Sequence, residues 1–217
     1  MNEGKLRLLK HYLIFTLCIF AAGFIMRLYW PGKDLITYLA DSTAYIAIII
    51  LAISLMVGSF KLLLNQSNPI SYNFRRDLGL TGGVLTIVHS VTGLFVHFRG
   101  NCWQYFFTKT GEGFTIRLDN FGLANYFGLF SALLILLLMI SSNNYSIRKL
   151  SPGRWKNFQR LTYLMFILAI THCVYYRVVL NSTGLIYSFY LPMLLIILGF
   201  QIIGIQLKLQ EAKNMSK

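Results

Sequence analysis

The chain has 217 residues, of which 56% are hydrophobic and 12% charged, and its formal net charge is +13. Ordinary soluble domains carry roughly one-quarter charged residues, so this composition excludes a soluble globular protein and favours an integral membrane protein. The basic residues are spread over four separate loops rather than gathered in one stretch, which argues against a nucleic-acid-binding protein.

Six apolar segments follow one another along the chain, and each reaches the roughly 20 residues that a helix needs to cross a hydrocarbon core. We expect spanning helices at about residues 12–29, 38–64, 78–98, 121–140, 158–176 and 185–207. The sequence therefore predicts the all-α class, as a six-helix integral membrane bundle that forms one domain over residues 1–217. The helices use most of the chain, which leaves no room for a separate soluble catalytic domain.

The basic residues are divided unevenly between the two ends of these helices. The side with both termini has Lys5, Arg7, Lys10, Lys61, Arg75, Arg76, Arg148, Lys149, Arg154, Lys156, Arg160, Lys208, Lys213 and Lys217. The other side has Arg27, Lys33, Arg99, Lys109, Arg117 and Arg177. The positive-inside rule therefore predicts cytoplasmic termini and a multi-pass protein of the cell's inner (plasma) membrane. The outer connection at residues 99–120 is the longest, and its aromatic residues predict that it lies on the membrane surface or folds over another part of the protein.

Two histidines interrupt apolar helices. His89 lies 11 residues beyond Leu78 and His172 lies 14 residues beyond Phe158, which places them about 16 Å and 21 Å into helices that both run outward. The two imidazoles can therefore meet at nearly the same depth. Ionisable side chains at membrane depth usually mark a cofactor, an ion path or a proton relay. Two neutral imidazoles from two helices are what bis-histidine ligation of a haem b iron requires, so we predict both as axial iron ligands.

Residues near this pair are candidates for contact with a porphyrin. Gly82 and Gly93 share the helical face of His89, where missing side chains would let a flat ligand lie against the backbone. Helix packing explains these glycines at least as well. Arg99 and Arg177 lie about one to three turns beyond the histidines, as partners for haem propionates or as anchors at the membrane interface.

The two remaining histidines are expected at the ends of helices. His97 lies about 12 Å further out than the third-helix ligand, where snorkelling to the interface is favoured over contact with a propionate. His11, beside Lys10 at the start of the first helix, is predicted to have an interfacial role only.

The stretches "RRDLGLTGGVLTIVH" at 75–89 and "GRWKNFQRLTYLMFILAITH" at 153–172 resemble the ferric reductase-like transmembrane domain. The likeness is closest to the MsrQ (YedZ) type, the haem-binding membrane subunit of the methionine sulfoxide reductase system. The resemblance implies that His89 and His172 ligate an outer haem. Relatives often carry a second histidine pair at the positions that Arg75 and Gln159 occupy here. Neither is a good haem ligand, so the resemblance implies one haem and departs from the MsrQ type at Gln159.

An iron bound by two imidazoles has no open position for a substrate, so we expect outer-sphere electron transfer. The chain has no glycine-rich dinucleotide fingerprint after a strand, so electrons must come from a cytoplasmic flavin reductase that carries FMN or FAD, or from membrane quinol. The acceptor would be a ferric chelate or a periplasmic oxidoreductase. The sequence thus predicts a cytochrome b-like electron-transfer subunit of an oxidoreductase, without a catalytic residue of its own.

The basic cluster on the terminal side has two interpretations. It can receive a flavin phosphate or an acidic partner protein. The positive-inside rule favours the second interpretation, in which these charges only set the topology of the chain. The cluster consists of Arg75, Arg76, Arg154, Lys156 and Arg160.

A rival hypothesis is a haem-free six-helix transporter or membrane assembly factor, in which His89 and His172 form a buried polar contact or a proton relay. Transport more naturally brings intramembrane carboxylates. Asp41 lies near an outer helix end and Asp77 near an inner one, so the apolar stretches hold no acidic residue at the midplane. A third possibility is a relative that has lost its function, with the missing second histidine pair as the trace.

Overall fold

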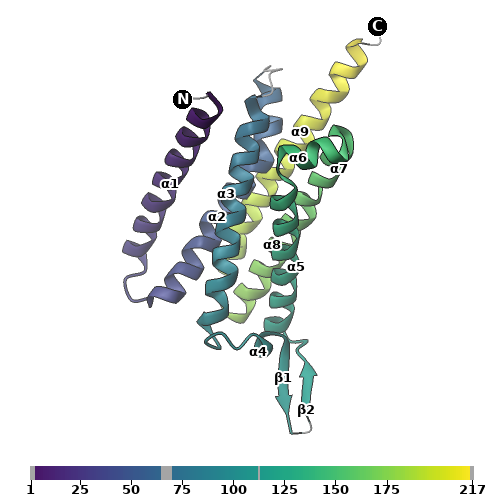
Figure 1. The fold of residues 1–217 in the computed structure, drawn as a ribbon. Coiled ribbons are helices and arrows are strands. Elements are labelled where there is room, and N and C mark those ends of the chain that lie inside the picture. The colour runs from purple at the N-terminus through teal and green to yellow at the C-terminus, as the bar shows by residue number, and fades with distance from the viewer. Residues whose placement is uncertain (1–2, 65–69, 112, 216–217) are drawn as a thin grey trace.

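The computed structural model describes residues 3–64, 70–111 and 113–215 (Figure 1). The long helices are α1 (Glu3–Tyr29), α2 (Leu35–Leu63), α3 (Ile70–Val96), α5 (Asn120–Ser141), α8 (Leu161–Val179) and α9 (Leu191–Met215). Six stretches of the described chain are long and apolar enough to cross a membrane: Leu9–Tyr29, Leu35–Leu63, Asn73–Val96, Asn120–Ser141, Pro152–Val179 and Ile186–Glu211. The predicted all-α, six-helix membrane bundle is confirmed, and both chain ends lie at the same end of it (Figure 1).

Local hydrogen bonds explain where two of the helices begin. The Asp34 carboxylate accepts a hydrogen bond from the Thr37 backbone N–H at 3.0 Å, and α2 begins at Leu35, the residue after Asp34. The Asp119 carboxylate accepts one from the Gly122 N–H at 2.8 Å at the start of α5. A helix leaves its first N–H groups without backbone partners, so each carboxylate stabilises the helix start that follows it.

Three helix boundaries differ from the sequence-based expectation. α3 begins at Ile70, well before residue 78, because residues 73–77, four of which are polar or charged, continue the helix beyond its apolar part. The fifth span is divided into α7 (Pro152–Gln159) and α8, and a short α6 (Asn144–Leu150) precedes it. The sixth span opens with the π-helical turn η1 (Ile186–Tyr190). Pro192 follows this turn and has no N–H to donate, which favours a locally widened helix.

The long connection between α3 and α5 forms a β-hairpin that the sequence analysis did not predict. It consists of α4 (Trp103–Phe106), β1 (Phe107–Thr110) and β2 (Gly113–Ile116), and the two strands pair antiparallel. The hairpin projects along the long axis of the bundle, beyond the helix ends (Figure 1). We call this end of the molecule the hairpin end and the opposite one the terminal end.

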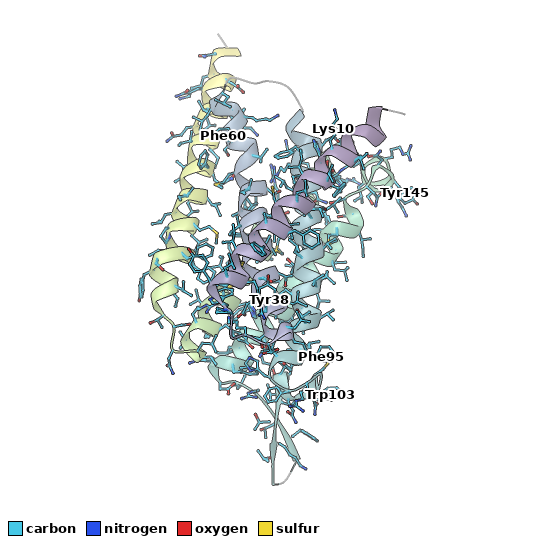
Figure 2. All side chains as sticks on the ribbon, turned by 90° about the vertical axis from the view of Figure 1, so that its left-hand side faces the viewer. Lys10, Tyr38, Phe60, Phe95, Trp103 and Tyr145 are labelled. Carbon is cyan, nitrogen blue, oxygen red and sulfur yellow. The ribbon has the colours of Figure 1, made fainter. Side chains whose placement is uncertain are left out.

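The core lies among α2, α3, α5, α8 and α9, and α1 runs along one side of the bundle (Figures 1 and 2). In α2, Leu51, Ala52 and Leu55 are each only 2% exposed. α1 packs more lightly, through apolar side chains that contact α2 and α3. Its Phe20 and Phe24 side chains are exposed, as is expected of a helix that presents one face to lipid. The chain is therefore embedded in the bilayer around a five-helix core, with α1 at the periphery.

Candidate functional site

His89 on α3 and His172 on α8 face each other inside the bundle. Their ring centroids lie 6.0 Å apart and the ring planes are inclined by 66°. The structure thus brings together the two side chains that the sequence analysis singled out. No hydrogen bond joins the two imidazoles, and the Nδ1 atom of each ring instead bonds to a different partner.

A backbone carbonyl of another helix orients each imidazole. His89 Nδ1 lies 2.9 Å from the carbonyl oxygen of Ala40 in α2, and His172 Nδ1 lies 2.7 Å from that of Ala124 in α5. A carbonyl oxygen can only accept, so each Nδ1 carries the proton and each Nε2 keeps a lone pair. An imidazole bonded in this way through one nitrogen is prepared to bind a metal through the other.

Gly128 makes room for one of these contacts. A Cβ atom at Gly128 would lie 2.7 Å from His172 Nδ1, closer than side chains tolerate. Gly128 is four residues after Ala124, and a helical side chain covers the carbonyl one turn before it, so a glycine leaves that carbonyl open. Ala44, another small residue, stands four residues after Ala40. A small residue four positions after each carbonyl was the sequence signal that could have identified Ala40 and Ala124 as the partners of the histidines.

The pair suits a haem iron better than a bare metal ion. A metal–imidazole nitrogen bond is about 2 Å long, so two imidazoles on opposite sides of one metal have centroids roughly 6 Å apart. The described residues contain no group of three or more His, Cys, Asp and Glu side chains that could hold a metal. A bare zinc ion would therefore lack protein ligands, whereas a porphyrin brings four nitrogens of its own.

The two predicted glycines have different surroundings. A Cβ at Gly82 would lie 2.8 Å from Leu51 Cγ, so Gly82 allows α3 to pack closely on α2. A Cβ at Gly93 would meet nothing within 4 Å. The Gly93 carbonyl accepts a hydrogen bond from the Tyr105 hydroxyl at 2.9 Å. Of the two glycines, only Gly93 borders open space.

The two predicted arginines also differ. Arg177 donates to the Tyr45 hydroxyl at 2.6 Å, and its guanidinium carbon lies 5.4 Å from the centre of the Tyr45 ring. Arg99 is exposed, in a turn where its φ is 48°, and its side chain makes no hydrogen bond to any residue that the structure describes. Contact of either side chain with a haem propionate stays a prediction.

Aromatic rings connect His172 with the hairpin end. Tyr176, one turn further along α8, has its ring 5.3 Å from that of His172 and 5.8 Å from that of His97. The His97 ring also lies 5.4 Å from Phe121, which in turn contacts Tyr105 at 5.7 Å. We call His97, Phe98, Tyr105, Phe121 and Tyr176 the hairpin-end aromatic cluster.

The His97 ring therefore contacts several rings at the hairpin end, although the residue itself is exposed. Partial burial lowers the pKa of His97 below its ordinary value, which favours the neutral imidazole. The sequence analysis placed His97 at the interface but missed Phe121 and Tyr176. The position of Tyr176, four residues after a candidate ligand, was the available signal.

The terminal end has no second histidine pair. Arg75 and Gln159 instead line a cavity of about 1300 Å³ that also contacts α2, α5 and α9. The Gln159 side-chain amide donates to Ser141 Oγ at 3.0 Å and Ser142 Oγ at 3.3 Å. At this position the chain offers polar contacts but no imidazole.

An interaction at the terminal end corrects the expectation for His11. Its Nδ1 lies 2.7 Å from Asp77 Oδ2, and Asp77 is 0% exposed. His11 thus ties α1 to a buried carboxylate of α3, in addition to lying near the helix start. Spacing along the sequence gave no sign of this contact, because 66 residues separate the two side chains.

A comparison with known protein families places most of the bundle in one family. The family model described as "Ferric reductase like transmembrane component" matches residues 43–170. The matched region extends from α2 into α8 and includes His89 but ends two residues before His172. No solved structure matches the chain. Because the match covers more than half of its length, the chain belongs to the ferric reductase-like transmembrane family.

Proposed function

We propose that this protein is a membrane haem b protein that relays electrons across the bilayer. One haem, held by His89 and His172, would receive electrons from a cytoplasmic flavin or quinol donor and pass them to an outer acceptor. The observation that carries the proposal is the facing imidazole pair, in which each Nδ1 is bonded to a backbone carbonyl. Family membership supports a role in membrane electron transfer.

The chain's own residues bind and orient the cofactor. His89 and His172 would hold the iron through Nε2, and the Ala40 and Ala124 carbonyls keep each ring in the required tautomer. Neutral imidazoles bring no net charge into the apolar interior. The haem would supply one-electron iron chemistry, and two histidine ligands leave no position at which a substrate can bind.

The hairpin-end aromatic cluster supports electron exit at that end. Its rings form a continuous series of contacts from His172 through Tyr176 to His97 and Phe121. Tyr105, in the short helix α4 before the hairpin, is only 2% exposed. The proposed acceptor, a ferric chelate or a periplasmic oxidoreductase, would approach this end.

The donor would act at the terminal end as a separate component, either a flavin reductase that carries FMN or FAD or a membrane quinol. Arg75 and Gln159 in place of a second histidine pair support a single haem. Within the family, we propose a function of the MsrQ type, the membrane subunit of a methionine sulfoxide reductase, with the departure at Gln159 noted above.

The haem-free rival receives less support from the geometry. A proton relay through His89 and His172 needs a hydrogen bond between them or through a shared partner. Their Nδ1 atoms instead bond to different carbonyls on different helices. A fixed pair of this kind suits a static ligand better than groups that exchange protons.

Transmembrane electron transfer can be measured in liposomes. The purified protein is reconstituted into vesicles that enclose a soluble reductant, with ferricyanide, an impermeant acceptor, outside. We expect ferricyanide reduction well above the rate in protein-free vesicles, and the background rate with His172→Ala vesicles. Equal rates for the wild-type protein and His172→Ala, when the wild-type protein contains haem, would overturn the relay function.

A further inference from the structure

We propose that the cavity at the terminal end, the inner cavity, binds one anionic phospholipid. Its phosphate would lie among the cationic side chains and its acyl chains would lie along the apolar wall. This inference concerns a different part of the molecule from the histidine pair and does not depend on the presence of haem.

The lining of the inner cavity is basic where it is polar. Its cationic residues are Lys61, Arg75, Arg76, Lys156, Arg160 and Lys208. Glu211 is the only acidic residue among the described residues that line it. These cations come from α2, α3, α7, α9 and the junction of α7 with α8, so the fold gathers them from distant parts of the sequence.

Most of these cations have no counter-ion within the part of the chain that the structure describes. Among the described residues, the side chains of Lys61, Arg75, Lys156, Arg160 and Lys208 form no ion pair and no hydrogen bond. The Arg76 guanidinium donates to Asn144 at 3.2 Å. Several cations around one cavity repel one another, and a bound anion would relieve that repulsion.

Among the five cations without a described partner, Arg75 has the side chain whose position is most restricted by its surroundings. Its side chain is partly buried against α2, where a Cβ at Gly58 would lie 3.7 Å from Arg75 Nη1. Its backbone carbonyl accepts a hydrogen bond from Ser54 Oγ at 3.1 Å. A partly buried guanidinium needs a hydrogen-bonded anion to offset its lost hydration, and the described chain supplies no carboxylate to it.

The deeper wall of the inner cavity is apolar. Leu51, Leu55, Ile135 and Leu138 line it and are at most 4% exposed. Its volume of about 1300 Å³ exceeds the roughly 300–1,000 Å³ of an ordinary small-molecule site. A ligand that fills it must therefore be large, anionic at one end and apolar along most of its length.

An anionic phospholipid fits this description better than the redox ligands do. The described lining contains no histidine or cysteine to ligate a second haem iron. A quinol has a neutral head group and would leave the cations uncompensated. A flavin mononucleotide shares the phosphate, but its polar ring matches the apolar wall less well. The basic end of the cavity also lies near the membrane surface, where anionic head groups gather.

Native mass spectrometry of the full-length protein tests this inference. The protein is purified in mild detergent and exchanged into nanodiscs of phosphatidylcholine with phosphatidylglycerol, and retained lipid is counted after release. We expect about one retained phosphatidylglycerol per chain. Arg75→Gln combined with Arg160→Gln should reduce retention tenfold or more, because two charge-assisted contacts to the phosphate are lost.

Two further variants keep the test decisive. Arg148→Gln combined with Arg154→Gln removes the same charge from exposed residues that do not line the inner cavity, and it should retain the lipid. Gly58→Leu fills part of the cavity without changing any charge, and it should also displace the lipid. Retained haem and helical circular dichroism verify that each variant is folded.

Several outcomes would overturn the inference. These are no retained lipid in the wild-type protein, equal loss from the two arginine pairs, or full retention by Gly58→Leu. FMN binding in place of phosphatidylglycerol, detected by flavin fluorescence after denaturation, would assign the inner cavity to a free phosphate ligand instead. Because haem content is measured separately, loss of the lipid with haem retained distinguishes this inference from the proposed function.

Discussion

The hairpin end and the terminal end of the bundle differ in chemistry although α3 contributes side chains to both. At the hairpin end, His89 and His172 face each other and backbone carbonyls satisfy their Nδ1 atoms. At the terminal end, Arg75 and Gln159 border a large cavity in which most cations have no counter-ion among the described residues. The difference teaches that a few side chains give the two ends of one helical scaffold unlike chemistry, an imidazole pair at one end and a basic cavity at the other.

The largest effect is expected from the ligands themselves. His89→Ala and His172→Ala should each abolish stable haem retention, because only one imidazole would remain to hold the iron. The measurement is the ratio of haem to protein after purification. His97→Ala serves as the matched control, since that ring lies in the hairpin-end aromatic cluster, and it should retain the haem. Loss of haem from His97→Ala but not from His172→Ala would show that the assignment is wrong.

Gly128→Val should have the next largest effect. The new side chain would occupy the space beside His172 Nδ1 and separate this ring from the Ala124 carbonyl. Second-shell partners of metal ligands typically contribute 10- to 100-fold to metal affinity, so we expect haem to dissociate roughly 10 times faster or more. Transfer of haem to apomyoglobin measures that rate. Gly199→Val, where a Cβ meets nothing within 4 Å, is the control and should behave like the wild-type protein.

His11→Ala tests whether the terminal end affects stability without affecting haem retention. It removes the hydrogen bond to the buried Asp77 carboxylate, and an uncompensated buried acceptor costs about 1–3 kcal/mol. We therefore expect a lower thermal unfolding temperature in detergent with an unchanged haem ratio. The double variant His11→Ala/Asp77→Ala should recover part of the loss. If His11→Ala alone loses haem but unfolds at the wild-type temperature, the view that the two ends act independently would be contradicted.

The smallest effect is expected at the start of α2. The Thr37 backbone N–H donates to Asp34 and holds the pKa of that exposed carboxyl below its ordinary value. A carboxyl whose folded-state pKa is lowered stabilises the fold above its unfolded pKa of about 3.9 and loses that effect as the pH falls through the folded value. Asp34→Ala should slightly lower the unfolding temperature at pH 7 and have a smaller effect at pH 2. Asp34→Asn should retain most of the cap. An equal decrease at both pH values would contradict the electrostatic explanation.

Much of the architecture could be predicted because the bilayer imposes strong rules on the sequence. The six spans follow from apolar length, and the facing of His89 and His172 follows from the helical rise along two helices that run in the same direction. The positive-inside rule places both termini on one side, and the structure brings them to the same end (Figure 1).

The remaining features depend on contacts between distant segments. The bonds of the two histidines to Ala40 and Ala124 involve backbone atoms, which sequence patterns do not distinguish. The His11–Asp77 contact and the inner cavity arise from the way α1, α3 and α9 are placed around the core. The hairpin was missed because its strands are only four residues long and mostly exposed, so they carry no hydrophobic period.

The most direct test of the central claim is an optical spectrum of the purified protein, oxidised and then reduced with dithionite, with haem determined against protein. The account predicts a Soret band and sharp α and β bands on reduction, as expected of an iron with two imidazole ligands. It also predicts about one haem per chain, because the chain has a single facing histidine pair. Two haems per chain would contradict the assignment of the terminal end, and no haem after expression with added haem would contradict the proposed function.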